Sequence, residues 1–146
     1  MLMLSTDRAV SGTYRGMMSY RQVTGFASPE LNSCLEATIT CSTACKACAD
    51  AFLAREIMGD LAQCVLASIE CVDICHATWQ LLMKSGKLNW RLLNKQIVKC
   101  RDACRRCEEI CAVHADVHDH CRVCAQSCKR CADACVKLLA SQPQYH

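Results

Sequence analysis

Cysteine is the residue type in this chain that is best suited to do chemistry, because sixteen of the 146 residues are cysteines. They recur at intervals of three and four, the spacing that places side chains on one face of an α-helix. Thiolate sulfur binds soft metal ions, so a long column of cysteines predicts a metal site. The sixteen candidate metal ligands are Cys34, Cys41, Cys45, Cys48, Cys64, Cys71, Cys75, Cys100, Cys104, Cys107, Cys111, Cys121, Cys124, Cys128, Cys131 and Cys135.

Four segments carry these cysteines at the a and d positions of a heptad pattern, which face the axis of a helix bundle. In the last segment the run from Cys121 to Cys135 alternates intervals of three and four without a break. In the first two segments, three slots of the same pattern hold a hydroxyl instead of a thiol, at Thr38, Ser68 and Thr78. All sixteen thiols are therefore expected inside the bundle.

Capping and turn signals predict where the helices begin and end. Ser28 is an N-cap residue with proline at the first helical position, and Asn89 is a second N-cap. Gly59 and Asp60 are read as a C-cap followed by a new N-cap. The predicted helices span about residues 28–58, 60–84 and 90–114, and a fourth follows a turn at residues 116–119 and runs to about residue 139.

Short connections make sequential helices antiparallel, so the predicted fold class is all-α, an up-down-up-down four-helix bundle over residues 28–141. Residues 1–27 are predicted to form an N-terminal tail or a short packing helix, and residues 142–146 a C-terminal tail. Beside its cysteines, the second helix carries another apolar stripe that includes Val65 and Trp79. We expect the N-terminal segment or another subunit to cover that stripe.

Residue numbering also predicts which thiols face each other, because residues at equal height in an antiparallel hairpin have a constant sum of residue numbers. The second hairpin pairs Cys111 with Cys124, Cys107 with Cys128, Cys104 with Cys131, and Cys100 with Cys135; the first pairs Cys45 with Cys71 and Cys41 with Cys75. We therefore expect layers of thiols along the bundle.

Other uses of sixteen cysteines fit this pattern less well. A core of cysteine alone would fill a bundle poorly compared with leucine. Neighbouring cysteines on one helix have nearly parallel Cβ directions, which suit a disulfide poorly. An iron–sulfur cluster needs loops that wrap four cysteines around one point, whereas the run from Cys121 to Cys135 lies on a predicted straight helix. Metal–thiolate binding remains.

The metal is either Zn²⁺ or Cu(I), and charge favours Cu(I). Zn²⁺ could form a tetrahedral four-Cys site. About four Zn²⁺ among sixteen thiolates would leave roughly −8 inside a narrow bundle, which is costly. Cu(I) bound by two thiolates, each shared by two ions, gives about one ion per cysteine and a neutral column. We therefore predict Cu(I) storage and detoxification, with a zinc-binding bundle as the alternative.

Imidazole and thioether groups gather at one predicted end of the bundle. His114 continues the inner pattern of the third helix, and His118, His120 and Met58 lie near the turns at the same end. Because such groups bind Cu(I) less tightly than thiolates do, they are candidate ligands at an entrance. For His118 and His120, ordinary solvated residues at a turn are the alternative. The opposite end is rich in leucine and is predicted to be closed.

The net charge and the lack of long apolar runs limit which partners and which cellular compartment we expect for this chain. A net charge of +3 gives little reason to expect nucleic acid or an acidic membrane as partner. No run of eighteen apolar residues could span a membrane, and the first residues lack the apolar core of a signal peptide. Free thiols indicate a reducing cytoplasm. We find no nucleophile–base–acid grouping and no glycine-rich phosphate loop, so we expect no enzyme activity.

The seam of Cys-x2-Cys and Cys-x3-Cys pairs, together with the turn from His114 to His120, resembles the bacterial copper storage proteins, specifically their cytosolic branch. The similarity covers about residues 28–140. It implies a homotetramer of four-helix bundles, each with a Cu(I)–thiolate core loaded through a histidine-bearing mouth. It carries those roles to the sixteen cysteines and the three histidines. Exported members carry a twin-arginine signal, and none is visible here.

Overall fold

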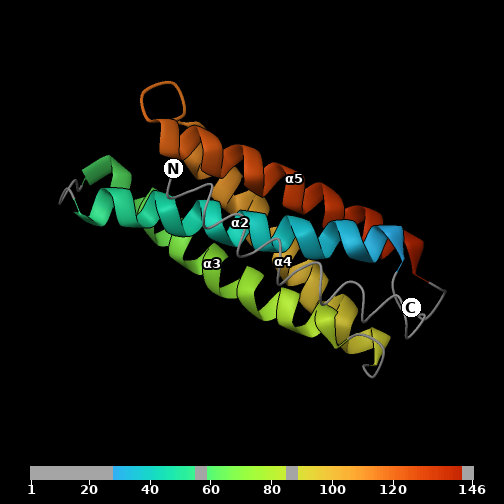
Figure 1. Ribbon diagram of the computed structural model, residues 1–146. Helices are drawn as coiled ribbons and strands as arrows, with labels where there is room; N and C mark the ends of the chain where they lie inside the picture. Colours follow the sequence, from blue (N-terminus) through green and yellow to red (C-terminus); the bar gives the residue numbers. More distant parts are fainter. Residues whose placement is uncertain (1–27, 55–58, 85–88, 143–146) are drawn as a thin grey trace, which may run out of the picture.

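The structure, a computed structural model, describes residues 28–54, 59–84 and 89–142 of the chain. These ranges contain four long helices, a short 3-10 turn and no strand. The helices pack side by side as a bundle (Figure 1), which confirms the predicted fold class. Their bounds are Pro29–Ala54 for α2, Ala62–Met83 for α3, Trp90–Ala112 for α4 and Asp119–Ser141 for α5, and the 3-10 turn η1 spans Gly59–Leu61.

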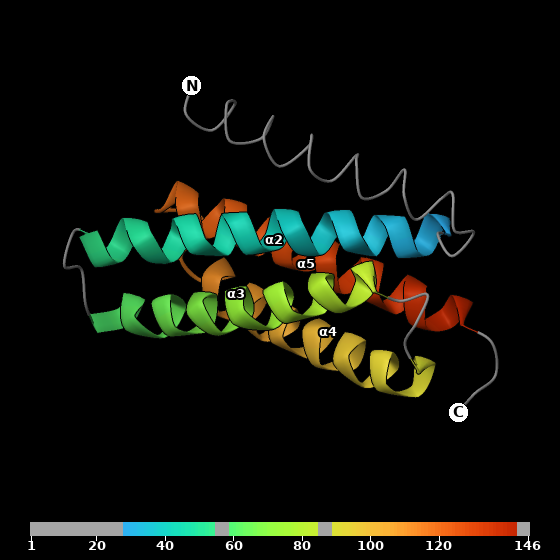
Figure 2. The same cartoon turned by 60° about the horizontal axis from the view of Figure 1, so that its bottom comes forward.

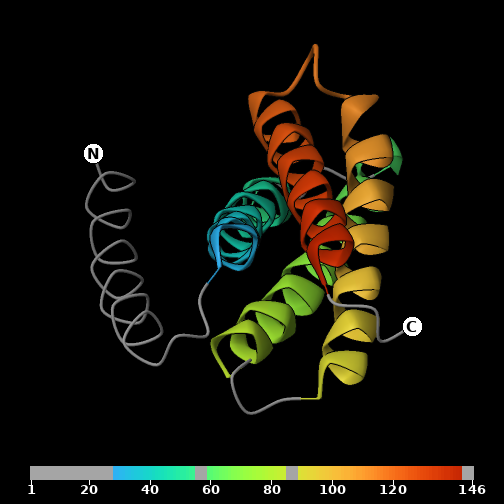
Figure 3. The same cartoon turned by 90° about the vertical axis from the view of Figure 1, so that its right-hand side faces the viewer.

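The four helices form a ring in which each packs against two others. Helix α2 lies between α3 and α5, and α4 closes the ring on the far side. Figure 2 shows α2 beside α3 along their lengths, and Figure 3 shows α4 beside α5. This order brings the end of α2 and the start of α3 to the same end of the bundle as the turn between α4 and α5. The predicted up-down-up-down path is therefore observed.

Two predicted helix starts have the expected side-chain caps. The Ser28 hydroxyl accepts a hydrogen bond from the Leu31 N–H at 3.1 Å, and the Asn89 side chain accepts one from the Arg91 N–H at 2.8 Å. Each cap satisfies a backbone donor that the first helical turn leaves unpaired. The predicted starts of α2 and α4 are thus confirmed.

Other helix ends differ from the prediction. Helix α3 begins after η1 with Leu61 as its N-cap residue, not Asp60, while Gly59 has φ of 79°, a left-handed conformation that favours glycine. Helix α4 ends at Ala112, so His114 lies in the following turn and not on the helix. There the His114 N–H donates to the Cys111 carbonyl at 3.0 Å, an i→i−3 bond that tightens the last turn.

The end of the bundle opposite that turn is closed by aliphatic side chains. Leu31 of α2, Leu82 of α3, Leu93 of α4 and Leu138 of α5 are all buried, and each helix contributes one of them. Burying a leucine stabilises a fold by about 1.5–3 kcal/mol. This leucine layer seals the predicted closed end and contributes apolar contacts between all four helices.

The second apolar stripe of α3 is only partly covered by the bundle itself. Val65 is buried, Val72 and Trp79 are half-buried, and Ile69 is 40% exposed. The N-terminal segment that was expected to cover it, residues 1–27, lies outside the described residues. No helix within the described ranges is long and apolar enough to cross a membrane.

We predict that Leu93→Ala destabilises the metal-free bundle by about 2–5 kcal/mol, because it removes a fully buried side chain and leaves a cavity. Its neighbour on the same helix, Leu92, is 62% exposed and provides a matched control. Leu92→Ala should change the free energy of unfolding by about 0.5 kcal/mol or less. Urea unfolding followed by far-UV circular dichroism measures both. Equal losses in the two variants, or a metal-free parent without helical signal, would contradict the closed leucine layer.

Candidate metal centre

All sixteen cysteine side chains point into the bundle. Each has 0% exposure, and all are free thiols with no disulfide among them. Helix α2 supplies four, α3 three, α4 four and α5 five. The predicted placement of every cysteine on an inner stripe is therefore what the structure shows, and the result is a column of sulfur along the bundle axis.

The middle of the column is built around Cys41. Its sulfur lies within 3.9 Å of one sulfur on its own helix and one on each of the other three helices. These neighbours are Cys45 at 3.8 Å, Cys71 at 3.9 Å, Cys104 at 3.9 Å and Cys128 at 3.7 Å. Four helices thus bring their sulfur atoms to a common centre, at separations that a single metal ion could bridge.

Sets of four sulfur atoms that all lie within 4.8 Å of one another follow along the column. They include Cys45–Cys107–Cys124–Cys128, Cys41–Cys45–Cys71–Cys128, Cys41–Cys71–Cys75–Cys104 and Cys75–Cys100–Cys104–Cys131. Successive sets share two sulfur atoms: first Cys45 and Cys128, then Cys41 and Cys71, then Cys75 and Cys104. The predicted facing pairs Cys107–Cys128, Cys104–Cys131, Cys45–Cys71 and Cys41–Cys75 each fall within one set. The sulfur atoms therefore form one continuous array and not a series of separate sites.

The array continues toward the α4–α5 turn. Cys64 of α3 lies 2.8 Å from Cys111, 3.6 Å from Cys121 and 4.0 Å from Cys48, measured between sulfur atoms. Cys111 and Cys124, another predicted pair, are 3.8 Å apart. Thiols of all four helices therefore lie close to the end where the histidines are found.

At the closed end the array narrows to one pair. The Cys34 sulfur of α2 lies 3.8 Å from the Cys135 sulfur of α5. One level further in, the sulfur of Cys100 lies 3.9 Å from the sulfur atoms of both Cys75 and Cys131. Beyond this level the leucine layer replaces sulfur, so the column stops inside the bundle.

Contacts between thiols lower the pKa of some and raise the pKa of others, and burial raises it. The hydrogen bond with Cys111 lowers the pKa of Cys64 to about 3, whereas burial raises the pKa of Cys121 to about 12. In the centre, hydrogen bonding with Cys104 raises the pKa of Cys128 well above the usual value for a thiol. Some thiols therefore stay protonated at neutral pH, and a metal ion that binds them must displace protons.

The three histidines gather at the predicted end but are not equally placed. His114 and His118 are half-buried, and His120 is exposed. The His118 ring packs edge-on against Phe52 of α2, with ring centroids 5.1 Å apart. This contact could not be predicted from the sequence, because Phe52 and His118 are far apart in the chain and neither residue type identifies its partner. Met58 lies outside the described residues.

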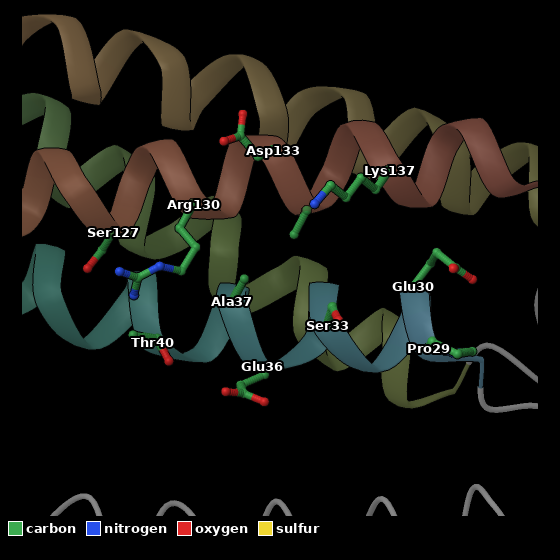
Figure 4. A pocket seen from close by; sticks show the side chains of 11 residues that line it. Pro29, Glu30, Ser33, Glu36, Ala37, Thr40, Ser127, Arg130, Asp133 and Lys137 are labelled. Carbon is green, nitrogen blue, oxygen red and sulfur yellow. The ribbon is translucent and has the colours of Figure 1, made fainter.

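A groove of about 460 Å³ on the outside of the bundle lies between α2 and α5 (Figure 4). Ala37 and Ala134 are among its lining residues, and Figure 4 shows Arg130 reaching from α5 toward α2. Its charged residues are of both signs, and none of its lining residues is a cysteine or histidine. The groove is thus separate from the sulfur array.

Comparisons with known proteins find similarity to copper storage proteins. The family model "Copper storage protein" matches residues 27–140. The cysteine-rich protein YhjQ of Bacillus subtilis (strain 168), described as uncharacterized, is 32% identical over 108 residues, which cover 74% of this chain and 94% of YhjQ. The copper storage protein Ccsp of Streptomyces lividans loaded with 10 copper equivalents is 36% identical, with a TM-score of 0.74 over 77% of this chain and 86% of that one. A structure of a cytosolic copper storage protein from the same organism with five coppers gives a TM-score of 0.75 at 36% identity, over 78% and 95%.

We predict that the thiols of the reduced, metal-free protein react with iodoacetamide about tenfold or more slowly in the folded state than in urea, because none is exposed. Mass spectrometry at timed intervals measures the number of modified thiols. All sixteen should be modified after unfolding. Equal rates in the folded and unfolded protein would contradict an enclosed array.

Proposed function

The chain belongs to the copper storage protein family, and from this premise we propose that it holds about one Cu(I) ion per cysteine along the whole sulfur array. The observation that carries the proposal is that successive four-sulfur sets share two members. Shared sulfur atoms suit bridging thiolates, and bridging lets one thiolate serve two Cu(I) ions. The sixteen cysteines are the proposed ligands.

Charge balance supports the same stoichiometry. Each Cu(I) ion that enters replaces about one thiol proton, so a positive charge enters as a positive charge leaves. The net charge of the buried column then stays near zero, and no uncompensated charge accumulates away from water. The surrounding helices contribute no buried lysine or arginine among the described residues, so an excess of thiolate charge would have no counter-ion there.

Nothing in the array favours the zinc alternative. A tetrahedral zinc site needs four thiolates of its own. Because neighbouring sets overlap, Cys45–Cys107–Cys124–Cys128 and Cys41–Cys71–Cys75–Cys104 can be occupied together, but the set Cys41–Cys45–Cys71–Cys128 then loses all of its ligands and Cys75–Cys100–Cys104–Cys131 loses half. Isolated zinc sites would thus leave many thiols unused.

We propose that copper enters at the histidine end. His114 and His118 are half-buried there, close in sequence to Cys111 and Cys121, while the leucine layer closes the other end. Imidazole binds Cu(I) more weakly than thiolate does, which suits a residue that passes an ion inward. His120 and Met58 are proposed as further entrance ligands from their positions in the sequence.

The wider biological setting is also a proposal. A similar protein is a cytosolic copper storage protein, and thiols stay free in a reducing compartment, so we place this chain in the cytoplasm. We propose that it stores copper without catalysing a reaction, because an array saturated with thiolates leaves no open coordination position for a substrate. The partly exposed stripe of α3 is proposed as a contact surface in a homotetramer.

We predict that the reduced chain binds about sixteen Cu(I) ions and at most about four Zn²⁺ ions, since Cu(I) is shared between sulfur atoms and Zn²⁺ is not. Anaerobic titration against a chromogenic Cu(I) chelator, with metal analysis after gel filtration, measures the capacity. Protein with alkylated thiols serves as the control and should bind neither metal. A Cu(I) capacity no higher than that for Zn²⁺ would rule out the proposed function.

We predict that His114→Ala changes the rate of Cu(I) loading or removal by about tenfold and leaves the final capacity nearly unchanged, because His114 lies at the entrance and not within the array. Stopped-flow absorbance of the copper–thiolate bands measures the rates. His76→Ala is a matched control, since His76 is exposed on the outside of α3 and packs on Trp79. Rates equal to those of the parent would argue against an entrance at His114.

A further inference from the structure

Three hydroxyl residues occupy inner positions that carry thiols elsewhere on the same stripes. Thr38, Ser68 and Thr78 each have 0% exposure, so their hydroxyl groups need partners inside the bundle. The two threonines find them in the backbone. Thr38 donates to the Leu35 carbonyl at 2.9 Å, and Thr78 donates to the Ile74 carbonyl at 2.6 Å. Their hydroxyl hydrogens are thus used within their own helices.

Ser68 behaves differently from the two threonines. Its Oγ atom lies 3.7 Å from the sulfur of Cys124, 3.9 Å from that of Cys107 and 3.9 Å from that of Cys111. Among the described residues it makes no hydrogen bond to a helix carbonyl. The Ser68 hydroxyl is therefore free to donate its hydrogen to sulfur, and it faces three thiols on α4 and α5.

The sulfur array passes Ser68 without interruption. Cys107 lies 3.7 Å and Cys111 3.8 Å from Cys124, and Cys124 lies 3.4 Å from Cys45. At this level α3 supplies a hydroxyl where α2, α4 and α5 supply thiols. Ser68 thus stands beside a continuous line of candidate ligands and does not separate two groups of them.

We propose that, in the copper-loaded protein, Ser68 is a positioning residue that donates a hydrogen bond to a thiolate sulfur of Cys107, Cys111 or Cys124. The inference rests on the proposed Cu(I) function. A neutral hydroxyl is a poor ligand for soft Cu(I), so Ser68 does not replace a thiolate as a ligand. A hydrogen bond to an ionised acceptor is stronger than one between neutral groups, so it stabilises the thiolate that a proton leaves behind.

The same geometry explains why a thiol is dispensable at this position. The three sulfur atoms around Ser68 already contact each other and Cys45, so copper can bridge them without a ligand from α3. The hydroxyl lowers the electron density on one of these sulfur atoms and fixes its lone-pair direction. Ser68 therefore tunes the copper sites at the level of Cys107, Cys111 and Cys124 and does not contribute an additional one.

The test compares Ser68→Ala with the parent by competition with a chromogenic Cu(I) chelator under anaerobic conditions. Loss of a charge-assisted hydrogen bond should let the chelator remove a subset of the ions at about tenfold lower concentration, with the total capacity unchanged. The sulfur-to-copper charge-transfer absorption should also move to longer wavelength, because an unbonded thiolate is a better electron donor. A purely structural role for Ser68 would leave that band in place.

Two further variants complete the test. Thr38→Val removes a buried hydroxyl that donates to a carbonyl, and it should match the parent in both chelator competition and absorption. Ser68→Cys places a seventeenth thiol beside the array and should raise the capacity by about one ion per chain. Far-UV circular dichroism of each metal-free variant confirms that the bundle has formed.

Several results would overturn the role of Ser68. These are unchanged copper retention in Ser68→Ala, an equal loss in Thr38→Val, or no gain of capacity in Ser68→Cys. Failure of the parent to bind many Cu(I) ions would instead overturn the proposed function itself, so the two failures can be told apart.

Discussion

Sixteen thiols share an interior without solvent access, where an isolated negative charge is costly. Each sulfur must therefore keep its proton, share the proton of a neighbour, or bind a cation. Contacts of 2.8 to 4.0 Å between sulfur atoms throughout the array allow thiols to share protons in this way. A monovalent soft cation serves the third without changing the charge of the interior. The acidity of the thiols, the overlap of the four-sulfur sets and the choice of metal all follow from this one constraint.

Stability and metal binding are assigned to different parts of the bundle. Cysteine is small and gives less apolar burial than leucine, so an interior of thiols contributes little to holding helices together. The leucine layer at the closed end, with Phe52 at the other, supplies large buried side chains instead. We therefore expect the bundle to keep its helices in register without metal, so that the sulfur atoms are already close together when the first ion arrives.

Most of this arrangement could be predicted from the sequence because heptad spacing determines which residues face a bundle axis. The inward position of all sixteen cysteines and the facing pairs within each hairpin follow from spacing alone. Details that depend on local hydrogen bonding could not be predicted. The i→i−3 bond at His114 ends α4 early, and η1 moves the start of α3 to Leu61. Likewise, serine and threonine look equivalent in the pattern, yet Thr38 turns its hydroxyl to the backbone while Ser68 turns it to sulfur.

The closed leucine layer has a consequence for the order in which stored ions come and go. If ions enter only at the histidine end, as proposed, an ion near Cys34 and Cys135 can leave only after the ions nearer the histidines have left. Ions can exchange places only by passing from sulfur to sulfur along the same line. On that proposal, the copper beside the leucine layer would exchange most slowly, and the copper beside the α4–α5 turn would respond first to changes in supply.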